Sequence, residues 1–129
     1  MKLSEIPYER PDLEQLQTKY KSLQIRFTEA KHSTDQISVL EEWNDLRIDL
    51  ATLSNLVYIR FSQNITDEWA KTEKDFFDQN GPTIHEWNIQ LIKEIVKSPF
   101  VEDIKKQWGE LFVEKLEMSL QTFIPEIKE

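Results

Sequence analysis

The stretch LEQLQTKYKSLQIRF, residues 13–27, indicates the fold class. Its apolar side chains recur at alternating steps of three and four residues, and the stripe consists of Leu13, Leu16, Tyr20, Leu23 and Phe27. This spacing places all of them on one face of an α-helix, with polar residues on the opposite face. We therefore predict a helix that begins after Pro11-Asp12 and ends near His32.

A second helix is predicted after Ser33, Thr34 and Asp35. These side chains can accept hydrogen bonds from the free amide groups at a helix start. The helix should extend to about Arg60, and its apolar stripe consists of Ile37, Leu40, Leu46, Leu50, Leu53 and Val57. Residues 64–67, Asn-Ile-Thr-Asp, indicate the break that follows it.

A third helix is expected after a cap at Thr66 or Asp67. Its inward aromatic residues are Trp69, Phe76 and Phe77. Gly81-Pro82 lies within this helix, and proline lacks the amide donor and crowds the preceding turn. We therefore expect the helix to be kinked or broken at Gly81-Pro82, before helical spacing resumes up to Lys97.

Ser98-Pro99 is a strong start signal for a fourth helix. Serine is a good cap, and proline at the first helical position loses no hydrogen bond that it could have made. The apolar stripe of this helix consists of Phe100, Ile104, Trp108, Leu111 or Phe112, Leu116 and Leu120. We expect a bend at Gly109 and an end at Pro125.

These helices define the predicted architecture. Short polar connections force neighbouring helices to run in opposite directions, which favours an antiparallel bundle. The chain has 129 residues with only 2 glycines, and no linker or change of composition divides it. The prediction is an all-α fold, an antiparallel bundle of about four long helices in a single domain spanning residues 1–129.

The composition excludes several kinds of partner. A net charge of −8 argues against nucleic acid, since phosphate binding needs clustered Lys and Arg. No apolar run approaches the roughly 20 residues that span a membrane, and residues 1–11 lack the apolar core of a signal peptide. The absence of cysteine removes disulfides and thiolate metal ligands, and together these features predict a cytoplasmic protein.

Several motifs along the helical pattern resemble those of one enzyme family. They are Tyr8-Glu9-Arg10-Pro11-Asp12-Leu13, Tyr58-Ile59-Arg60-Phe61, Thr66-Asp67-Glu68-Trp69, Phe76-Phe77-Asp78, Ser98-Pro99-Phe100, Trp108-Gly109-x-Leu111-Phe112 and Thr122-Phe123-Ile124-Pro125-Glu126-Ile127. Because of these motifs, the chain resembles the amino-terminal helical region of the oligoendopeptidase F family, a thimet oligopeptidase-like family of zinc metallopeptidases. The resemblance covers almost the whole chain.

None of these motifs is catalytic. The family uses His-Glu-x-x-His, in which two histidines hold zinc and the glutamate is the general base. The histidines here are His32 and His85, and Ile89 stands where the second ligand after His85-Glu86 would be needed. The resemblance therefore implies a domain that is not an enzyme on its own and holds no cofactor, with zinc in the full enzyme. Its implied task is to help enclose the peptide-binding cleft, and its implied partner is the catalytic domain, in cis or in trans.

Two alternatives remain open. One is an autonomous interaction or scaffold bundle that binds a partner helix through exposed aromatic residues. The other, more remote, is a di-iron carboxylate bundle, because Glu29-x-x-His32 has the spacing of a metal-binding pair. Such sites need a second pair, and Pro82 stands where His85 would require a glutamate. A solvated histidine at a helix end is the simpler interpretation of His32.

Two groups of residues are candidates for contact sites. The first surrounds the junction of the second and third helices and consists of Tyr58, Arg60, Asn64, Asp67 and Glu68. Arg60 could pair with Asp67 or Glu68 across the turn and fix the loop. The alternative is a surface that faces the catalytic domain.

The second group lies in the carboxy-terminal half of the fourth helix. Apolar residues there cover more of the circumference than one core requires. The candidate interface residues are Phe112, Leu116, Leu120 and Phe123. We expect them to contact a catalytic domain or to mediate self-association, since large exposed apolar patches are unusual on monomers. The tryptophans Trp43, Trp69, Trp87 and Trp108 are expected in the core, although one could lie at an interface.

Overall fold

The computed structural model describes the backbone of residues 7–127 and the side chains of residues 7–121. This part of the chain contains no strand and forms the helices α1 (Leu13–Glu29), α2 (Ser33–Gln63), α3 (Glu68–Val96), α4 (Val101–Trp108) and α5 (Glu110–Ile127). The all-α prediction is confirmed. None of these helices is long and apolar enough to cross a bilayer.

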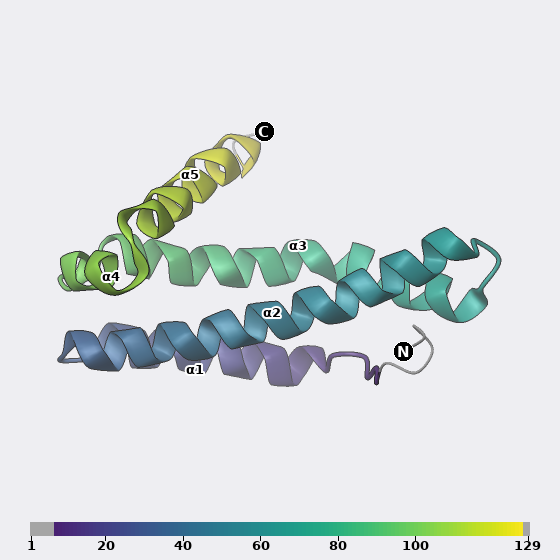
Figure 1. Cartoon of the computed structure of the whole chain (residues 1–129), viewed down its shortest axis with the longest axis horizontal. Helices are drawn as coiled ribbons and strands as arrows, with labels where there is room; N and C mark the ends of the chain where they lie inside the picture. Colours follow the sequence, from purple (N-terminus) through teal and green to yellow (C-terminus); the bar gives the residue numbers. More distant parts are fainter. Residues whose placement is uncertain (1–6, 128–129) are drawn as a thin grey trace.

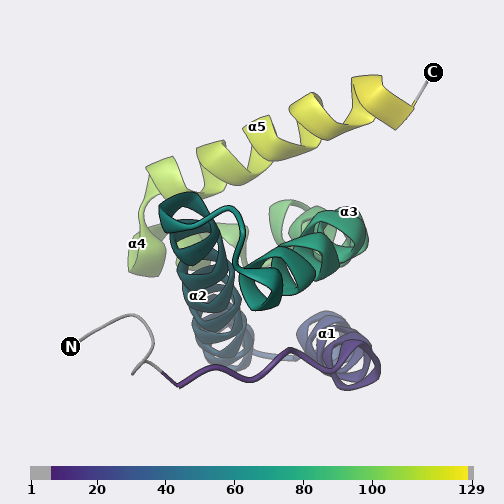
Figure 2. The same cartoon turned by 90° about the vertical axis from the view of Figure 1, so that its right-hand side faces the viewer.

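Helices α1, α2 and α3 lie side by side and alternate in direction, as their short connections require (Figure 1). Each of the three contacts the other two, and they form a triangle when viewed along their length (Figure 2). Helix α4 packs at the end where α2 begins and α3 ends. Helix α5 contacts α3 and α4 and then leaves the three long helices at an angle.

The core lies between the three long helices and continues under α4 and α5. Its largest members besides Trp43 are Phe27, Leu40, Ile89, Leu91, Ile95, Ile104, Val57 and Val113, all fully buried. The buried Trp43 indole donates from Nε1 to Asn88 Oδ1 at 2.9 Å, and the Arg47 guanidinium carbon lies 3.9 Å from its ring centre. The other three tryptophans are only partly buried. The prediction that the tryptophans lie in the core therefore holds fully for Trp43, while Trp87 and Trp108 pack partly buried against the core and Trp69 does not belong to it.

Aspartates begin α1 and α3. The Asp12 carboxylate accepts a hydrogen bond from the amide of Gln15, and Asp67 accepts one from the amide of Ala70, both at 3.1 Å. A carboxylate in this position pairs with an amide that has no partner inside the helix. The predicted cap at Thr66 or Asp67 is thus confirmed as Asp67.

The start of α2 differs from the prediction. Residues 33–35 lie inside the helix, and its N-cap is His32, whose side chain makes no capping hydrogen bond. The buried Gln36 instead donates from Nε2 to a carbonyl in the last turn of α1 at 3.0 Å, and its Oε1 accepts from the Ser98 hydroxyl. Ser98 therefore links α2 to the connection before α4, whose N-cap is Phe100.

Helix α3 continues through Gly81-Pro82, so the predicted break there is wrong, while the alternative of a kink stays a prediction. A proline inside a helix costs about 3 kcal/mol or more, because it removes one hydrogen bond and crowds the preceding turn. Buried residues on both sides of it, such as Phe77 and Ile89, supply packing that offsets this cost.

Gly109 divides the predicted fourth helix into α4 and α5. Its φ of 96° and ψ of 151° lie in a region that is accessible almost only to glycine. The predicted helix is therefore interrupted at Gly109 and not merely bent, and α5 takes a new direction. The predicted end at Pro125 is also wrong, because α5 extends to Ile127.

Candidate functional site

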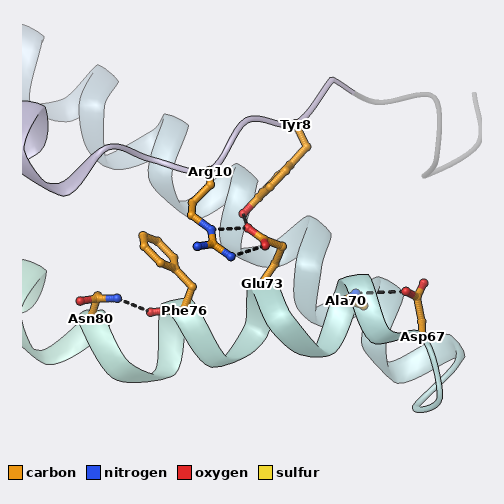
Figure 3. Close-up of polar contacts among 7 residues, drawn as sticks. All are labelled: Tyr8, Arg10, Asp67, Ala70, Glu73, Phe76 and Asn80. Carbon is orange, nitrogen blue, oxygen red and sulfur yellow. Dashed lines mark hydrogen bonds and ion pairs between the residues drawn. The ribbon is translucent and has the colours of Figure 1, made fainter.

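The amino-terminal segment, residues 7–12, lies along the first half of α3 and is held there by Glu73 (Figure 3). Glu73 is only 7% exposed. Its carboxylate accepts hydrogen bonds from Arg10 Nε at 2.9 Å, Arg10 Nη2 at 2.6 Å and the Tyr8 hydroxyl at 2.7 Å. The two-point contact with Arg10 is strong and directional, because both groups are planar and charged.

Aromatic rings flank this carboxylate on the same face of α3. The rings of Trp69 and Tyr8 meet edge to face, with centres 5.1 Å apart, and the Arg60 guanidinium carbon lies 4.3 Å from the Trp69 ring centre. On the other side, the Arg10 guanidinium carbon lies 4.9 Å from the centre of Phe76. Positions 69, 73 and 76 share a helix face because they are four and three residues apart. We call Trp69, Glu73 and Phe76 the clasp face.

The contacts shift the pKa of each titratable group in this cluster. The hydrogen bonds from Arg10 lower the pKa of Glu73, and the same bonds raise the pKa of Arg10. Burial, followed by the hydrogen bond to Glu73, raises the pKa of Tyr8. The carboxylate therefore stays ionised, the guanidinium stays charged and the phenol stays neutral, which are the states that these hydrogen bonds require.

The predicted junction residues lie next to this cluster. Arg60 Nε donates to Asp67 Oδ2 at 2.8 Å, so the ion pair predicted across the turn is present. The amide at the start of α3 and then Arg60 lower the pKa of Asp67. Asn64 Oδ1 accepts from the Thr66 amide at 3.1 Å and from its hydroxyl at 2.6 Å, which shapes the turn. Glu68 is exposed at the first position of α3.

Tyr58 belongs to a second polar cluster between α2 and α3. Its hydroxyl donates to Asp78, which also accepts from Lys74 Nζ at 2.6 Å. The hydrogen bond to Asp78 raises the pKa of Tyr58 to about 12. The structure thus places the five junction residues along one end of the α2–α3 pair, and a role toward a catalytic domain stays a prediction.

Sequence reasoning missed the cluster of Tyr8, Arg10 and Glu73. The available signal was the motif Tyr8-Glu9-Arg10-Pro11, which places two hydrogen-bond donors directly before a helix start. Glu73, however, lies 63 residues after Arg10 and is one of 24 acidic residues, so no local pattern selects it. The pairing arises because the fold brings the start of α3 beside the segment that precedes α1.

The candidate interface residues on the last helix divide between core and surface. Leu116 is 5% exposed, and Phe112 and Leu120 pack partly buried against the core. The side chain of Phe123 lies outside the described residues. Among residues 110–121 of α5, whose side chains the structure describes, the large apolar residues that are exposed are instead Leu111 and Met118, which are 61% and 62% exposed. They are seven residues apart and therefore share a helix face.

The described side chains do not fit a zinc or di-iron site. His85 is exposed on α3, whereas Ile89, one turn later, is 1% exposed and packs in the core. Glu29 is the last residue of α1 and His32 lies beyond its end, so the pair does not share one helix face. Within residues 7–121, no three or more His, Asp or Glu side chains are grouped so that they could hold a metal ion.

Comparisons with known proteins identify relatives of the whole chain. The family model of the Peptidase M3 N-terminal domain matches residues 3–123. A solved structure described as an oligoendopeptidase F aligns with a TM-score of 0.92 and 34% identity, over 98% of this chain and 22% of that one. A structure of PZ peptidase A with an inhibitor aligns with a TM-score of 0.92 and 32% identity, over 98% of this chain and 22% of that one. The structure of an oligoendopeptidase F from Bacillus anthracis strain Ames aligns with a TM-score of 0.89 and 32% identity, over 93% of this chain and 22% of that one.

A search of curated proteins found no significant match. The chain spans about 22% of the length of the solved relatives, and it aligns with them over nearly its own full length. The resemblance carried by the sequence motifs is therefore confirmed at the level of the domain. The chain belongs to the family of peptidase M3 N-terminal domains.

Proposed function

We propose that this chain is the non-catalytic amino-terminal domain of an oligoendopeptidase F-like zinc metallopeptidase, and that it helps to enclose the peptide-binding cleft of the full enzyme. The main support is the alignment of 98% of this chain with 22% of an oligoendopeptidase F. In addition, the position where a second zinc histidine would be needed is occupied by the buried Ile89. Zinc and the hydrolytic chemistry then belong to the remainder of such an enzyme.

Helix α5 is the proposed contact with the catalytic part. It leaves the three long helices at an angle and exposes Leu111 and Met118 on one face (Figure 1). Removing such apolar surface from water stabilises an interface by roughly 25 cal/mol per Å². A wall of rigid helices beside the cleft would restrict access to short, unfolded peptides.

The test is a graft in which this chain replaces the matching amino-terminal part of the oligoendopeptidase F that is 34% identical. We expect the graft to cleave a short quenched-fluorescence peptide in a zinc-dependent manner, and the isolated chain to show no cleavage. Zinc-dependent cleavage by the isolated, contaminant-free chain would contradict the non-catalytic assignment. A folded graft without activity would contradict the proposed place in this enzyme.

Paired substitutions locate the contact surface within the graft. Leu111→Ser with Met118→Ser should lower its activity and its thermal stability. Ile25→Ser on α1, where the side chain is 45% exposed, is the matched control and should change neither. A graft that is indifferent to the α5 substitutions, together with a strictly monomeric isolated chain, would instead favour an autonomous interaction module.

A further inference from the structure

The clasp face has the features of a ligand site whose ligand belongs to the same chain. Glu73 is the only buried acidic residue among residues 7–121. A buried carboxylate is costly unless its oxygen atoms are hydrogen-bonded. The three hydrogen bonds that it accepts come from Tyr8 and Arg10, which lie 65 and 63 residues away, and not from its own helix.

Side chains, not the backbone, hold the amino-terminal segment on α3. The backbone of residues 7–11 makes no hydrogen bond to the backbone of any other described residue. Recognition therefore depends on the Tyr8 ring against Trp69, the Arg10 guanidinium against Phe76, and the shared carboxylate. The segment contains Pro7 and Pro11, and the residue before a proline, here Arg10 before Pro11, favours an extended conformation. Such a segment loses little conformational freedom on binding.

The site is open on the side of the segment. The Arg10 side chain is 47% exposed, whereas that of Glu73 is 9% exposed. Neither Tyr8 nor Arg10 belongs to the hydrophobic core that joins the helices. Release of the segment from the clasp face would therefore leave the contacts within this core in place.

We propose that the clasp face is a recognition site for an extended Tyr-x-Arg segment, that residues 8–10 occupy it in cis, and that the same segment of a second copy can occupy it in trans. Arginine is selected over lysine because its planar guanidinium reaches both carboxylate oxygens. Tyrosine is selected over phenylalanine because its hydroxyl donates to the same carboxylate. This inference goes beyond the proposed function and does not depend on it.

The experiment uses the full chain with Tyr8→Ala and Arg10→Ala, which empties the site. The probe is a fluorescein-labelled peptide with the sequence of residues 7–13, followed by anisotropy. We expect the peptide to bind this variant at least about tenfold more tightly than the wild-type chain, where the cis segment competes at an effective concentration near the millimolar range. Adding Glu73→Gln to the variant should abolish binding, and a peptide with lysine in place of Arg10 should bind several-fold more weakly.

Circular dichroism establishes that each variant remains helical. No peptide binding to the folded double variant, or binding that Glu73→Gln leaves unchanged, would overturn the proposal. If the double variant does not fold, the wild-type chain provides the second measurement. Unlabelled peptide should then shift the NMR signal of the Trp69 indole by displacing the cis segment, and the lysine peptide should need a several-fold higher concentration to produce the same shift. An unchanged indole signal at millimolar peptide would overturn the proposal.

Discussion

Replacing Gly109 with alanine tests whether α4 and α5 are separate helices. Gly109 has φ 96° and ψ 151°, and an added Cβ would have no atom within 4 Å beyond its chain neighbours. The substitution therefore meets no clash, and its cost is backbone strain alone. For a residue other than glycine in this region the strain is about 1–3 kcal/mol. We expect the free energy of unfolding to fall by that amount.

The opposite sign is expected if α4 and α5 form one continuous helix. In a helix interior alanine is more favourable than glycine by about 0.8–1 kcal/mol. The same substitution would then stabilise the chain. The sign of the change thus distinguishes an interrupted helix from the merely bent helix that local sequence suggests.

The assay is urea denaturation followed by far-ultraviolet circular dichroism, compared through the midpoint and slope. Gly81→Ala is the matched control, because it also has open space around the new Cβ but lies inside α3. There the gain in helix propensity opposes the steric preference of a residue before proline, so stability should stay within about 1 kcal/mol of wild type. A Gly109→Ala chain as stable as wild type, or more stable, would refute the interruption at Gly109.

Three further predictions concern buried groups. Trp43→Ala should lower the free energy of unfolding by about 3–5 kcal/mol in the same titration, because it opens a cavity. Asn88→Ala should lower it by about 1–3 kcal/mol, because the Trp43 indole donor is left unpaired. A small effect of both substitutions would contradict the described core. The folded pKa of Glu73 is lowered, so its contribution to stability is complete above the unfolded value of roughly 4.3 and is lost as the pH falls through the folded value. The Glu73→Gln chain should therefore lose less stability than the wild-type chain as the pH falls, which denaturation at several pH values would measure. An equal loss in both chains would contradict the described hydrogen bonds of Glu73. Burial raises the pKa of Tyr20 to about 12, so the free energy of unfolding should fall as the pH rises from about 10 toward 12. Tyr20→Phe should reduce that fall in denaturation at alkaline pH. An unchanged fall would show that Tyr20 is not its source.

Local sequence was sufficient to predict the all-α fold class and the family. The spacing in the sequence predicts the buried face of α1, and four members of its stripe are buried, namely Leu16, Tyr20, Leu23 and Phe27. The cap of α3 is equally local, because Asp67 accepts its hydrogen bond from a residue three positions away. Such features depend on neighbours in the chain, whose separation fixes which face they share and which amides they can reach.

Other features required the assembled fold. The continuity of α3 through Pro82 depends on packing that outweighs a local penalty, and the backbone of Gly109 depends on where α5 must go to cover α3. The burial of Leu116 beside the exposed Leu111 and Met118 depends on the direction that α5 takes after Gly109. Glu73 is one of 24 acidic residues in the sequence, and only the tertiary structure shows that Arg10 and Tyr8 are its partners. Contacts between residues far apart in sequence form only when the helices pack, and no local periodicity encodes them.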